Sequence, residues 1–566
     1  MPYRSPAADL RFILDSVAGF GQVAATDRFA EATPDTVGAI LTEAARLCDE
    51  TIAPLNRAGD THPARLENGV VRTSPGFSEG YAAIAEGGWI GTAADPEYGG
   101  MGLPVSLSMA VNDMMAGACL ALQLNPLMSQ GQIEALEHHA DEEMKSLYLP
   151  KLISGEWCGT MNLTEPQAGS DVGALRTKAE PAEDGTYRIT GQKIYITWGD
   201  NDFTENVCHL VLARLPDAVE GTKGISLFMV PKVIPDAEGN LGARNDLRVV
   251  SLEHKLGIHG SPTAVMEYDR AVGWLVGAKH GGMAAMFTMM NNARLGVGLQ
   301  GIGVAEAAVQ AAADYAADRK QGRAGGTGAI IEHADVRRML AAMRADVFAA
   351  RSIAMMNAVA IDMGTATGDD AWRARAAFLT PISKAFGTDV GIEVAGTGVQ
   401  VHGGMGFIEE TGAAQFLRDV RITAIYEGTN GIQAMDLVGR KLADGGTAAQ
   451  ALIDEVLEGA RAAKGDLPDL AGAVWEAAES LREATDWMLG LAPADRMAGA
   501  VPYLRAFARV LGGHAHLAAA RAGDDARGRL AAFYIRRLMP EYEGLLAHVR
   551  EGSEALMAIR PEDLVA

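Results

Sequence analysis

The spacing of hydrophobic residues changes twice along the chain and separates helical segments from a central β segment. Up to about Pro150, apolar residues recur at helical spacing, as in TVGAILTEAARLCDETIAPL. From about Glu156 to Gly277, short β-rich runs alternate with turn residues, which favours an antiparallel barrel or sandwich. Long helical runs return from Gly281. The pattern therefore predicts a mainly α protein with a central antiparallel β-domain.

The length of 566 residues exceeds what one hydrophobic core supports, so several domains are expected. The stretch LADGGTAAQ, around Ala443 to Gln450, is typical of a linker, and helical patterns follow it. We predict a helical domain with a short extension over 1–155, a β-domain over 156–280 and a helical bundle over 281–444. An extra C-terminal helical domain is predicted over 445–566.

Net charge and cysteine usage narrow the possible partners. A net charge of −23 opposes binding to nucleic-acid phosphates and to anionic membrane surfaces. The four cysteines are dispersed without a CxxC pair, so buried reduced thiols are expected and no metal site is predicted. The N-terminus lacks the apolar core of a signal peptide, and no charge-free stretch of membrane-spanning length is expected. A cytoplasmic location follows as an expectation.

Two segments of the predicted β-domain combine polar side chains with flexible or aromatic positions. LTEPQAGSDVGALRTKA (Leu163 to Ala179) places Thr164 and Ser170 around Gly169, where a ligand can approach the main chain closely. QKIYITWGD places Tyr195, Thr197 and Trp198 together, and an aromatic surface beside a hydroxyl suits a flavin. A polar turn and an ordinary strand with aromatic packing are the simpler readings of the two segments.

Two later segments have the same ambiguity. VQVHGGMGF carries Gly403 and Gly404, which permit approach to a pyrophosphate or simply form a loop, and His402 in it is expected to be structural. IYEGTNGIQAMDLVGRKL places Glu427 after an apolar pair and before a helix that Thr429 or Asn430 can cap. Glu427 is either a favourable charge at a helix start or a carboxylate whose raised pKa suits a general base.

Together, these segments resemble the acyl-CoA dehydrogenase family over about residues 40–440. TEPxAGSD is similar to its flavin-contacting loop and QKIYITWG to its K-x-W-I-T-N-G segment. RKQGR resembles the R-x-Q-F-G stretch, QVHGGMGF the Q-x-x-GG-x-G loop and IYEGTNGIQ the IYEGT-x-x-IQ loop. Five motifs in the family's order make a chance match improbable.

The resemblance implies FAD as cofactor and removal of two hydrogens from Cα and Cβ of an acyl-CoA thioester. It implies that Glu427 removes the α-proton and that flavin N5 accepts the β-hydride. The implied cofactor residues are Leu163, Thr164, Gly169, Ser170, Tyr195, Thr197 and Thr429, together with Arg319, Gln321, Gln400, Gly403 and Gly404, which would reach the cofactor of a neighbouring subunit. The implied substrate residues are Ser170, Asn291, Arg294 and Gly428.

Some positions depart from the family's pattern. Ala293 stands where a minority of members carry their catalytic glutamate, which leaves Glu427 without a rival there. Tyr195 replaces the family's stacking tryptophan, Trp198 its asparagine and Gly322 the phenylalanine of R-x-Q-F-G. These three departures concern packing at the flavin edge and the contact between subunits, and none of them concerns the base.

The N-terminal extension and helical tail resemble a subgroup of longer bacterial acyl-CoA dehydrogenases. One activity in that subgroup is dehydrogenation of 3-methylmercaptopropionyl-CoA in dimethylsulfoniopropionate breakdown, which makes this thioester the expected substrate. Short-, medium- or long-chain fatty acyl-CoAs are the alternative. The resemblance also implies a homodimer that passes electrons to an electron-transferring flavoprotein.

Three alternative functions make different predictions for this sequence. An acyl-CoA oxidase shares fold and cofactor but reduces oxygen, so peroxide release would distinguish it. A non-catalytic, flavin-containing nucleic-acid-binding relative would need a basic C-terminal surface, yet acidic residues interleave with Arg536 and Arg537. A purely structural helical scaffold leaves the ordered motifs unexplained.

Overall fold

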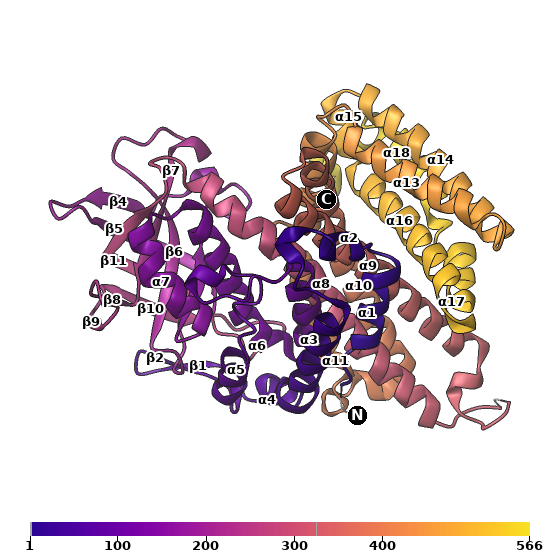
Figure 1. Cartoon of the computed structure of the whole chain (residues 1–566), viewed down its shortest axis with the longest axis horizontal. Coiled ribbons are helices and arrows are strands. Elements are labelled where there is room, and N and C mark those ends of the chain that lie inside the picture. Colours follow the sequence, from indigo (N-terminus) through magenta and orange to yellow (C-terminus); the bar gives the residue numbers. More distant parts are fainter. Residues whose placement is uncertain (1–2, 324, 566) are drawn as a thin grey trace. The chain divides into compact units, whose positions relative to one another are not determined.

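The computed structural model describes residues 3–323 and 325–565. The chain separates into two compact units (Figure 1). The sheet unit comprises residues 43–293, and the helical unit comprises residues 3–42 and 294–565. The division into four domains stays a prediction. The sheet unit joins most of the first predicted domain to the predicted β-domain, and the helical unit joins the two predicted C-terminal domains to the first forty or so residues.

The sheet unit holds all the strands assigned in the described residues. They are β1 (Arg65–Glu67), β2 (Val70–Arg72), β3 (Trp157–Asn162), β4 (Lys178–Pro181), β5 (Tyr187–Thr197), β6 (Asn206–Arg214), β7 (Ile225–Pro231), β8 (Val233–Pro235), β9 (Leu241–Arg244), β10 (Leu247–Leu252) and β11 (Thr263–Val276). Its helices are α4 (Leu55–Thr61), α5 (Phe77–Glu86), α6 (Val105–His139) and α7 (Glu142–Ser154). The β1–β2 hairpin lies in a segment predicted to be helical, since three-residue strands leave little periodic signal.

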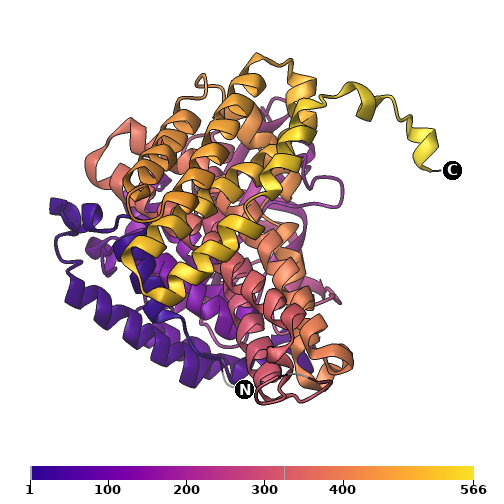
Figure 2. The same cartoon turned by 90° about the vertical axis from the view of Figure 1, so that its right-hand side faces the viewer.

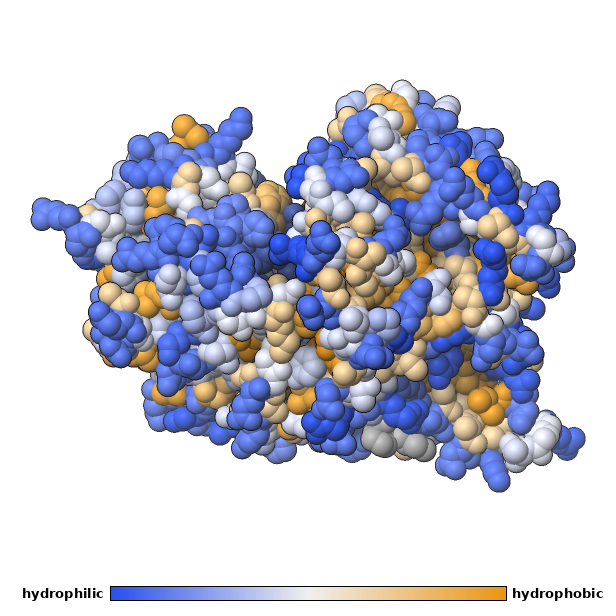
Figure 3. All heavy atoms as spheres, in the orientation of Figure 1, coloured by the Kyte–Doolittle hydropathy of each residue, from blue (hydrophilic) through white to orange (hydrophobic). Residues whose placement is uncertain are grey.

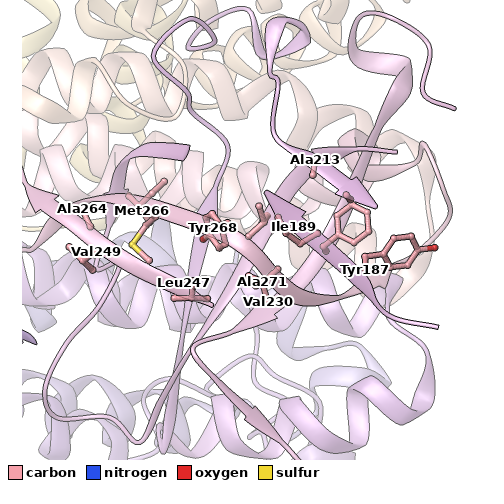
Figure 4. Close-up of a cluster of buried hydrophobic side chains, with 14 of the residues drawn as sticks. Tyr187, Ile189, Ala213, Val230, Leu247, Val249, Ala264, Met266, Tyr268 and Ala271 are labelled. Carbon is pink, nitrogen blue, oxygen red and sulfur yellow. The ribbon is translucent and has the colours of Figure 1, made fainter. Parts of the chain in front are cut away.

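Seven strands form the main sheet in the order β10-β11-β5-β4-β6-β3, with β7 pairing to both β11 and β6. The prediction of an antiparallel domain is confirmed for most pairs, but β3 and β4 pair parallel with β6. All but the last residue of β6 are buried, as expected for a strand covered on both faces. Ile189, Val230, Met266 and Tyr268 belong to the core on this sheet (Figure 4).

The helical unit consists of helices of very different lengths, from four residues in α2 to 34 in α9. They are α1 (Ala7–Ser16), α2 (Gly21–Ala24), α9 (Ala334–Thr367), α10 (Asp370–His402), α11 (Ala413–Val420), α12 (Asn430–Asp436), α13 (Thr447–Ala463), α14 (Pro468–Gly490), α15 (Pro493–Ala498), α16 (Ala500–Ala522), α17 (Asp525–Arg537), α18 (Glu541–Arg550), α19 (Glu554–Met557) and α20 (Pro561–Leu564). The chain passes between units within α3 (Pro34–Leu47) and α8 (Gly282–Asp318). The linker is shorter than predicted, because α13 already begins at Thr447.

The C-terminal helices pack onto the rest of the helical unit through α16. This helix contacts α9, α10 and α12 as well as α13, α14, α17 and α18. The buried guanidinium of Arg509 on α16 pairs with Asp346 of α9 and with Glu541 of α18. Figure 2 shows the C-terminal helices as a bundle in orange and yellow, beyond which α19 and α20 extend away from it.

Three helices are long and apolar enough to cross a membrane by length and composition, namely α6, α8 and α9. The expectation that no segment reaches this length is therefore wrong. The apolar window of each helix is 94% buried inside the fold, so its composition is explained by packing in the core. The face seen in Figure 3 is mostly hydrophilic, with hydrophobic residues scattered over it. The four cysteines are buried, as predicted.

Candidate active site

Glu427 lies in a strained turn between the 3-10 helix Arg421–Ala424 and α12. Its φ is +55° and that of Gly428 is +84°, so two successive residues are left-handed. The left-handed region costs a residue with a side chain on the order of 1–2 kcal/mol. Thr429 then caps α12, because its Oγ1 accepts a hydrogen bond from the N–H of Ile432 at 3.4 Å. Glu427 therefore lies just before α12, whose N-terminus is already capped by Thr429.

Hydrogen bonds from two side chains hold this turn in place. Gln433 Nε2 donates to the carbonyl oxygens of Glu427 at 3.1 Å and of Gly428 at 3.3 Å. The ammonium of Lys384 on α10 donates to the carbonyl of Gly428 and to Asn430 Oδ1, both at 2.9 Å. The surrounding structure thus stabilises a conformation that the turn would not adopt by itself.

Close packing of α8 on α10 brings two cations next to the turn. A Cβ on Gly298 of α8 would lie 2.7 Å from the carbonyl oxygen of Ser383, so only glycine permits this approach of the helices. One turn before Gly298, Arg294 Nη2 lies 3.9 Å from where a Cβ on Gly428 would be. Arg294 is buried and pairs with Asp436 of α12 at 3.6 Å.

The carboxylate of Glu427 has the properties expected of a general base. Its Oε2 is inaccessible to solvent and has no hydrogen-bond partner among the residues described. Burial raises the pKa of Glu427 to about 7, although the charges of Arg294 and Lys384 oppose the rise. A carboxylate with a pKa near 7 is a stronger base than one at 4.5 and is still ionised in a large fraction of molecules at neutral pH.

Burial also shifts the pKa values of two neighbours of Glu427. Burial lowers the pKa of Lys384 to about 7, against the attraction of Glu427. Burial, followed by the charge of Glu427, raises the pKa of Tyr426, whose hydroxyl donates to Gln300 Oε1. Tyr426 therefore stays neutral and supports the loop rather than exchanging protons.

In the sheet unit, the structure brings the two predicted flavin segments together. The N–H of Ile194 in β5 donates to the carbonyl of Thr164 at 2.9 Å. Beneath this contact, buried Lys193 forms an ion pair with Glu165 at 2.8 Å and donates to the carbonyl of Leu163 at 3.0 Å. Glu165 also accepts hydrogen bonds from the N–H groups of Arg176 and Thr177, so the start and the end of this loop are held together.

A bulge in β5 turns Tyr195 outward. Lys193 opposes Met266 and Ile196 opposes Ala264, so two residues of β5 face Val265 alone. Tyr195 has φ +60° and is 60% exposed, as expected where a bulge redirects a side chain. Trp198 instead belongs to the core, because it is buried and its indole N–H donates to the carbonyl of Ala121 at 3.1 Å.

The remaining predicted flavin residues of the sheet unit suit a planar polar ligand. Thr164 and Thr197 are half-buried, whereas Gly169 and Ser170 are exposed, and Leu163 is buried with its carbonyl oxygen accepting from Lys193. A Cβ on Gly169 would meet only open space. Hydroxyls, an aromatic ring and accessible main chain beside one another are groups that can hold an FAD ring and ribityl chain. The residues present therefore fit this cofactor.

A third group of predicted cofactor residues gathers where α8 and α10 end. Tyr315 of α8 stacks on His402 of α10 with ring centroids 4.5 Å apart, which joins the segments carrying Arg319 and Gln321 to those carrying Gln400, Gly403 and Gly404. All five of those predicted residues are exposed. His402 is structural, as expected, since it is buried and its Nδ1 is 2.7 Å from the carbonyl of Gly398.

The predicted substrate residues differ in their surroundings. Asn291 is exposed on α8, whereas Arg294 is buried beside Gly428 and pairs with Asp436. Contact of Arg294 with the substrate stays a prediction, and the structure places its guanidinium beside the turn that carries Glu427. Thr429 is exposed and Gly428 is half-buried.

Sequence reasoning missed Lys384, Gln433 and Asp436 as residues of this site. Lys384 is the one charged residue within AFLTPISKAFGT, and a lone lysine in an otherwise uncharged helical stretch is a recognisable signal. Gln433 belongs to the IYEGTNGIQ segment already singled out. Asp436 gave no signal, because an acid within a helix is ordinary.

Comparison with known families matches almost the whole chain. Models described as acyl-CoA dehydrogenase N-terminal, middle and C-terminal domains match residues 35–156, 160–271 and 280–442. A model described as acetyl-CoA dehydrogenase C-terminal like matches residues 447–560. The chain belongs to the acyl-CoA dehydrogenase family, whose members are FAD-dependent oxidoreductases.

Individual relatives agree. The chain is 45% identical to 3-methylmercaptopropionyl-CoA dehydrogenase of Ruegeria pomeroyi over 89% of its own length and 88% of that protein. It is 37% identical to a butyryl-CoA dehydrogenase of Syntrophomonas wolfei, covering 70% of this chain and 68% of that one. The fold is similar to an acyl-CoA dehydrogenase of Bacillus anthracis complexed with FAD (TM-score 0.74, 22% identity, 95% and 91% of the two chains).

Proposed function

We propose that this dehydrogenase converts 3-methylmercaptopropionyl-CoA to methylthioacryloyl-CoA, with Glu427 as the base that removes the α-proton. The geometry of Glu427 carries the proposal for the base: it is a carboxylate held in a left-handed turn with an oxygen that is buried and unpartnered. The relative from Ruegeria pomeroyi, which matches nearly the full length, supports the thioether substrate.

The α-proton of a thioester is weakly acidic, so its removal requires both a base and stabilisation of the enolate-like charge on the thioester oxygen. Glu427 supplies the base in a desolvated position, where its pKa lies at about 7. The backbone N–H of Glu427 donates no hydrogen bond within residues 3–323 and 325–565, which leaves it free to donate to that oxygen. FAD, when bound, accepts the hydride from Cβ.

The cofactor would be held by the residues that the resemblance indicates. Thr164, Ser170, Tyr195 and Thr197 offer hydroxyls and an aromatic ring on the sheet unit. The exposed group that includes Arg319 and Gly403 would serve the cofactor of a second subunit in a homodimer. Charge from Arg319 and accessible main chain at Gly403 suit a pyrophosphate.

We further propose that electrons leave through an electron-transferring flavoprotein in the cytoplasm. The absence of a distinct oxygen- or nicotinamide-binding motif in the sequence motivates this choice. Release of peroxide in air, without an added acceptor and at a rate comparable to turnover, would instead identify an oxidase. Light scattering of the purified protein, giving a mass of about twice 59.5 kDa, tests the homodimer.

The substrate is tested by anaerobic reduction of the FAD-loaded enzyme. We expect 3-methylmercaptopropionyl-CoA to bleach the flavin band with a higher rate constant than butyryl-CoA. A faster reaction with butyryl-CoA would assign the enzyme to fatty acyl-CoAs, the substrate class in the name of the Syntrophomonas wolfei relative. Failure of every acyl-CoA in a series of chain lengths would refute the proposed activity.

A further inference from the structure

We propose that Lys384 is a positioning residue for the reaction: its buried ammonium clamps the turn that carries Glu427 and keeps the base in its left-handed conformation. This inference rests on the proposed role of Glu427. Lys384 is fully buried in α10, and its two acceptors, the carbonyl of Gly428 and Asn430 Oδ1, lie on the two residues that flank Thr429.

The clamp continues along one side of α10. Asn430 Nδ2 donates to Asp389 Oδ1 at 2.7 Å, to Thr388 Oγ1 at 2.9 Å and to the carbonyl of Ala385 at 3.3 Å. Residues from one turn of α10 therefore bind the side chain of Asn430, while Lys384 also binds the carbonyl of Gly428. A helix is a rigid support, so the position of the turn is set by α10 rather than by the loop itself.

The clamp acts where the backbone is strained. Glu427 has φ +55°, and a residue with a side chain keeps this left-handed conformation only when neighbouring groups over-determine it, whereas Gly428 at +84° adopts it at little cost. Lys384 holds the carbonyl oxygen of Gly428, and Gln433 holds the carbonyl oxygen of Glu427. Without Lys384, Gly428 retains only the 3.3 Å bond from Gln433. The turn would then relax toward ordinary backbone angles and displace the carboxylate.

Charge is the second effect of Lys384. The charged groups that interact with the Lys384 ammonium are Glu427 on the turn, Asp389 on its own helix and Arg294 on α8, and Arg294 is in turn paired with Asp436. The positive charges of Arg294 and Lys384 both oppose the rise that burial causes in the pKa of Glu427. Glu427 and Lys384 therefore stabilise each other's charged form, against the effect of burial on the pKa of each.

The test compares three variants of the FAD-loaded enzyme. Lys384→Met removes both the donor and the charge, Lys384→Arg keeps the charge, and Lys464→Met makes the same change at an exposed lysine of the helical unit. The pH dependence of kcat/KM is measured with 3-methylmercaptopropionyl-CoA and with butyryl-CoA. Hydrogen exchange of peptides that cover residues 425–436 reports on the turn independently of activity.

We expect Lys384→Met to lower kcat/KM by about a hundredfold, the effect of a misplacement of about 1 Å. The acid limb of the kcat/KM profile of Lys384→Met should move up by about one pH unit, because the positive charge that favours the ionised carboxylate of Glu427 has been removed. Lys384→Arg should keep the limb at or below its wild-type position. Exchange over 425–436 should be faster in Lys384→Met, and Lys464→Met should match the wild type in every measurement.

A purely structural lysine would lower activity without moving the acid limb, and that result would overturn the proposal. Should Lys384→Met fail to fold, Asn430→Ala provides the second test, because it removes the other end of the clamp while leaving the charge. Unchanged exchange over 425–436 in Asn430→Ala would equally count against the clamp. Glu427→Gln serves as the reference variant. Full activity of Glu427→Gln would refute the proposed base. An inactive Glu427→Gln together with an unmoved acid limb in Lys384→Met would refute the role of Lys384 alone.

Discussion

Replacement of Glu427 by glutamine is predicted to stabilise the fold, and to do so more strongly as the pH rises. Burial raises the pKa of Glu427 from 4.5 to about 7. Between these two values the unfolded chain binds fewer protons than the folded one, so folding loses stability as the pH rises. At 1.36 kcal/mol per pH unit, the full penalty is about 3 kcal/mol at pH 8 and falls to about 1 kcal/mol at pH 5.

Glutamine has the same size and accepts the same left-handed strain, but it carries no charge to desolvate. Thermal unfolding of wild type and Glu427→Gln at pH 5, 6, 7 and 8, without substrate, measures the difference. We expect the melting temperature of the variant to exceed that of the wild type by an amount that grows with pH. Glu458→Gln, at an exposed glutamate of α13, controls for loss of a carboxylate. A difference that stays constant from pH 5 to 8 would refute the reasoning.

Two further predictions concern buried ion pairs. Lys193→Met leaves the carboxylate of Glu165 buried without its cation, so it should cost about 3–5 kcal/mol and weaken FAD binding; the double variant with Glu165→Gln should lose less, and both are measured by thermal unfolding and flavin titration. Arg509→Met leaves Asp346 uncompensated between α16 and α9, so urea unfolding should show a loss of about 3–5 kcal/mol, whereas Arg536→Met at an exposed arginine should show almost none.

The pH dependence of the Lys193–Glu165 pair has a definite sign. Burial raises the pKa of Glu165, but the charge of Lys193 and several hydrogen bonds outweigh it and lower the pKa to about 2. The stability that this carboxylate contributes is therefore complete above its unfolded value of 4.5 and is lost as the pH falls toward 2. The difference in the free energy of unfolding between the wild type and Lys193→Met should therefore become smaller as the pH falls.

Much of the fold follows from periodicity, and its exceptions have physical reasons. The apolar spacing predicted the long helical runs from Gly281 and the β-rich region over about 156–277, within which β3 to β11 lie. It missed short strands such as β1 and β2, which have too few residues for alternation to show. It also missed the parallel pairing of β3 with β6, because strand pairing between distant segments leaves no local pattern.

The site was predictable only in part. Glu427 could be named because its segment matches a family motif, and the turn geometry gives that residue a strained backbone and a buried oxygen. The sequence did not predict that Lys384 lies beside it, since Lys384 and Gly428 are 44 residues apart and no local pattern links them. Trp198 illustrates the reverse case: an aromatic residue in a candidate ligand segment belongs to the core.

The central claim, that Glu427 is the base of an acyl-CoA dehydrogenase, is tested most directly by flavin reduction in Glu427→Gln. The variant is loaded with FAD, its visible spectrum is recorded, and 3-methylmercaptopropionyl-CoA is added without oxygen. We predict that the flavin stays bound and that its band is not bleached, whereas the wild type is bleached under the same conditions. Bleaching of the variant at the wild-type rate would contradict the account, because the proton would then leave to another group.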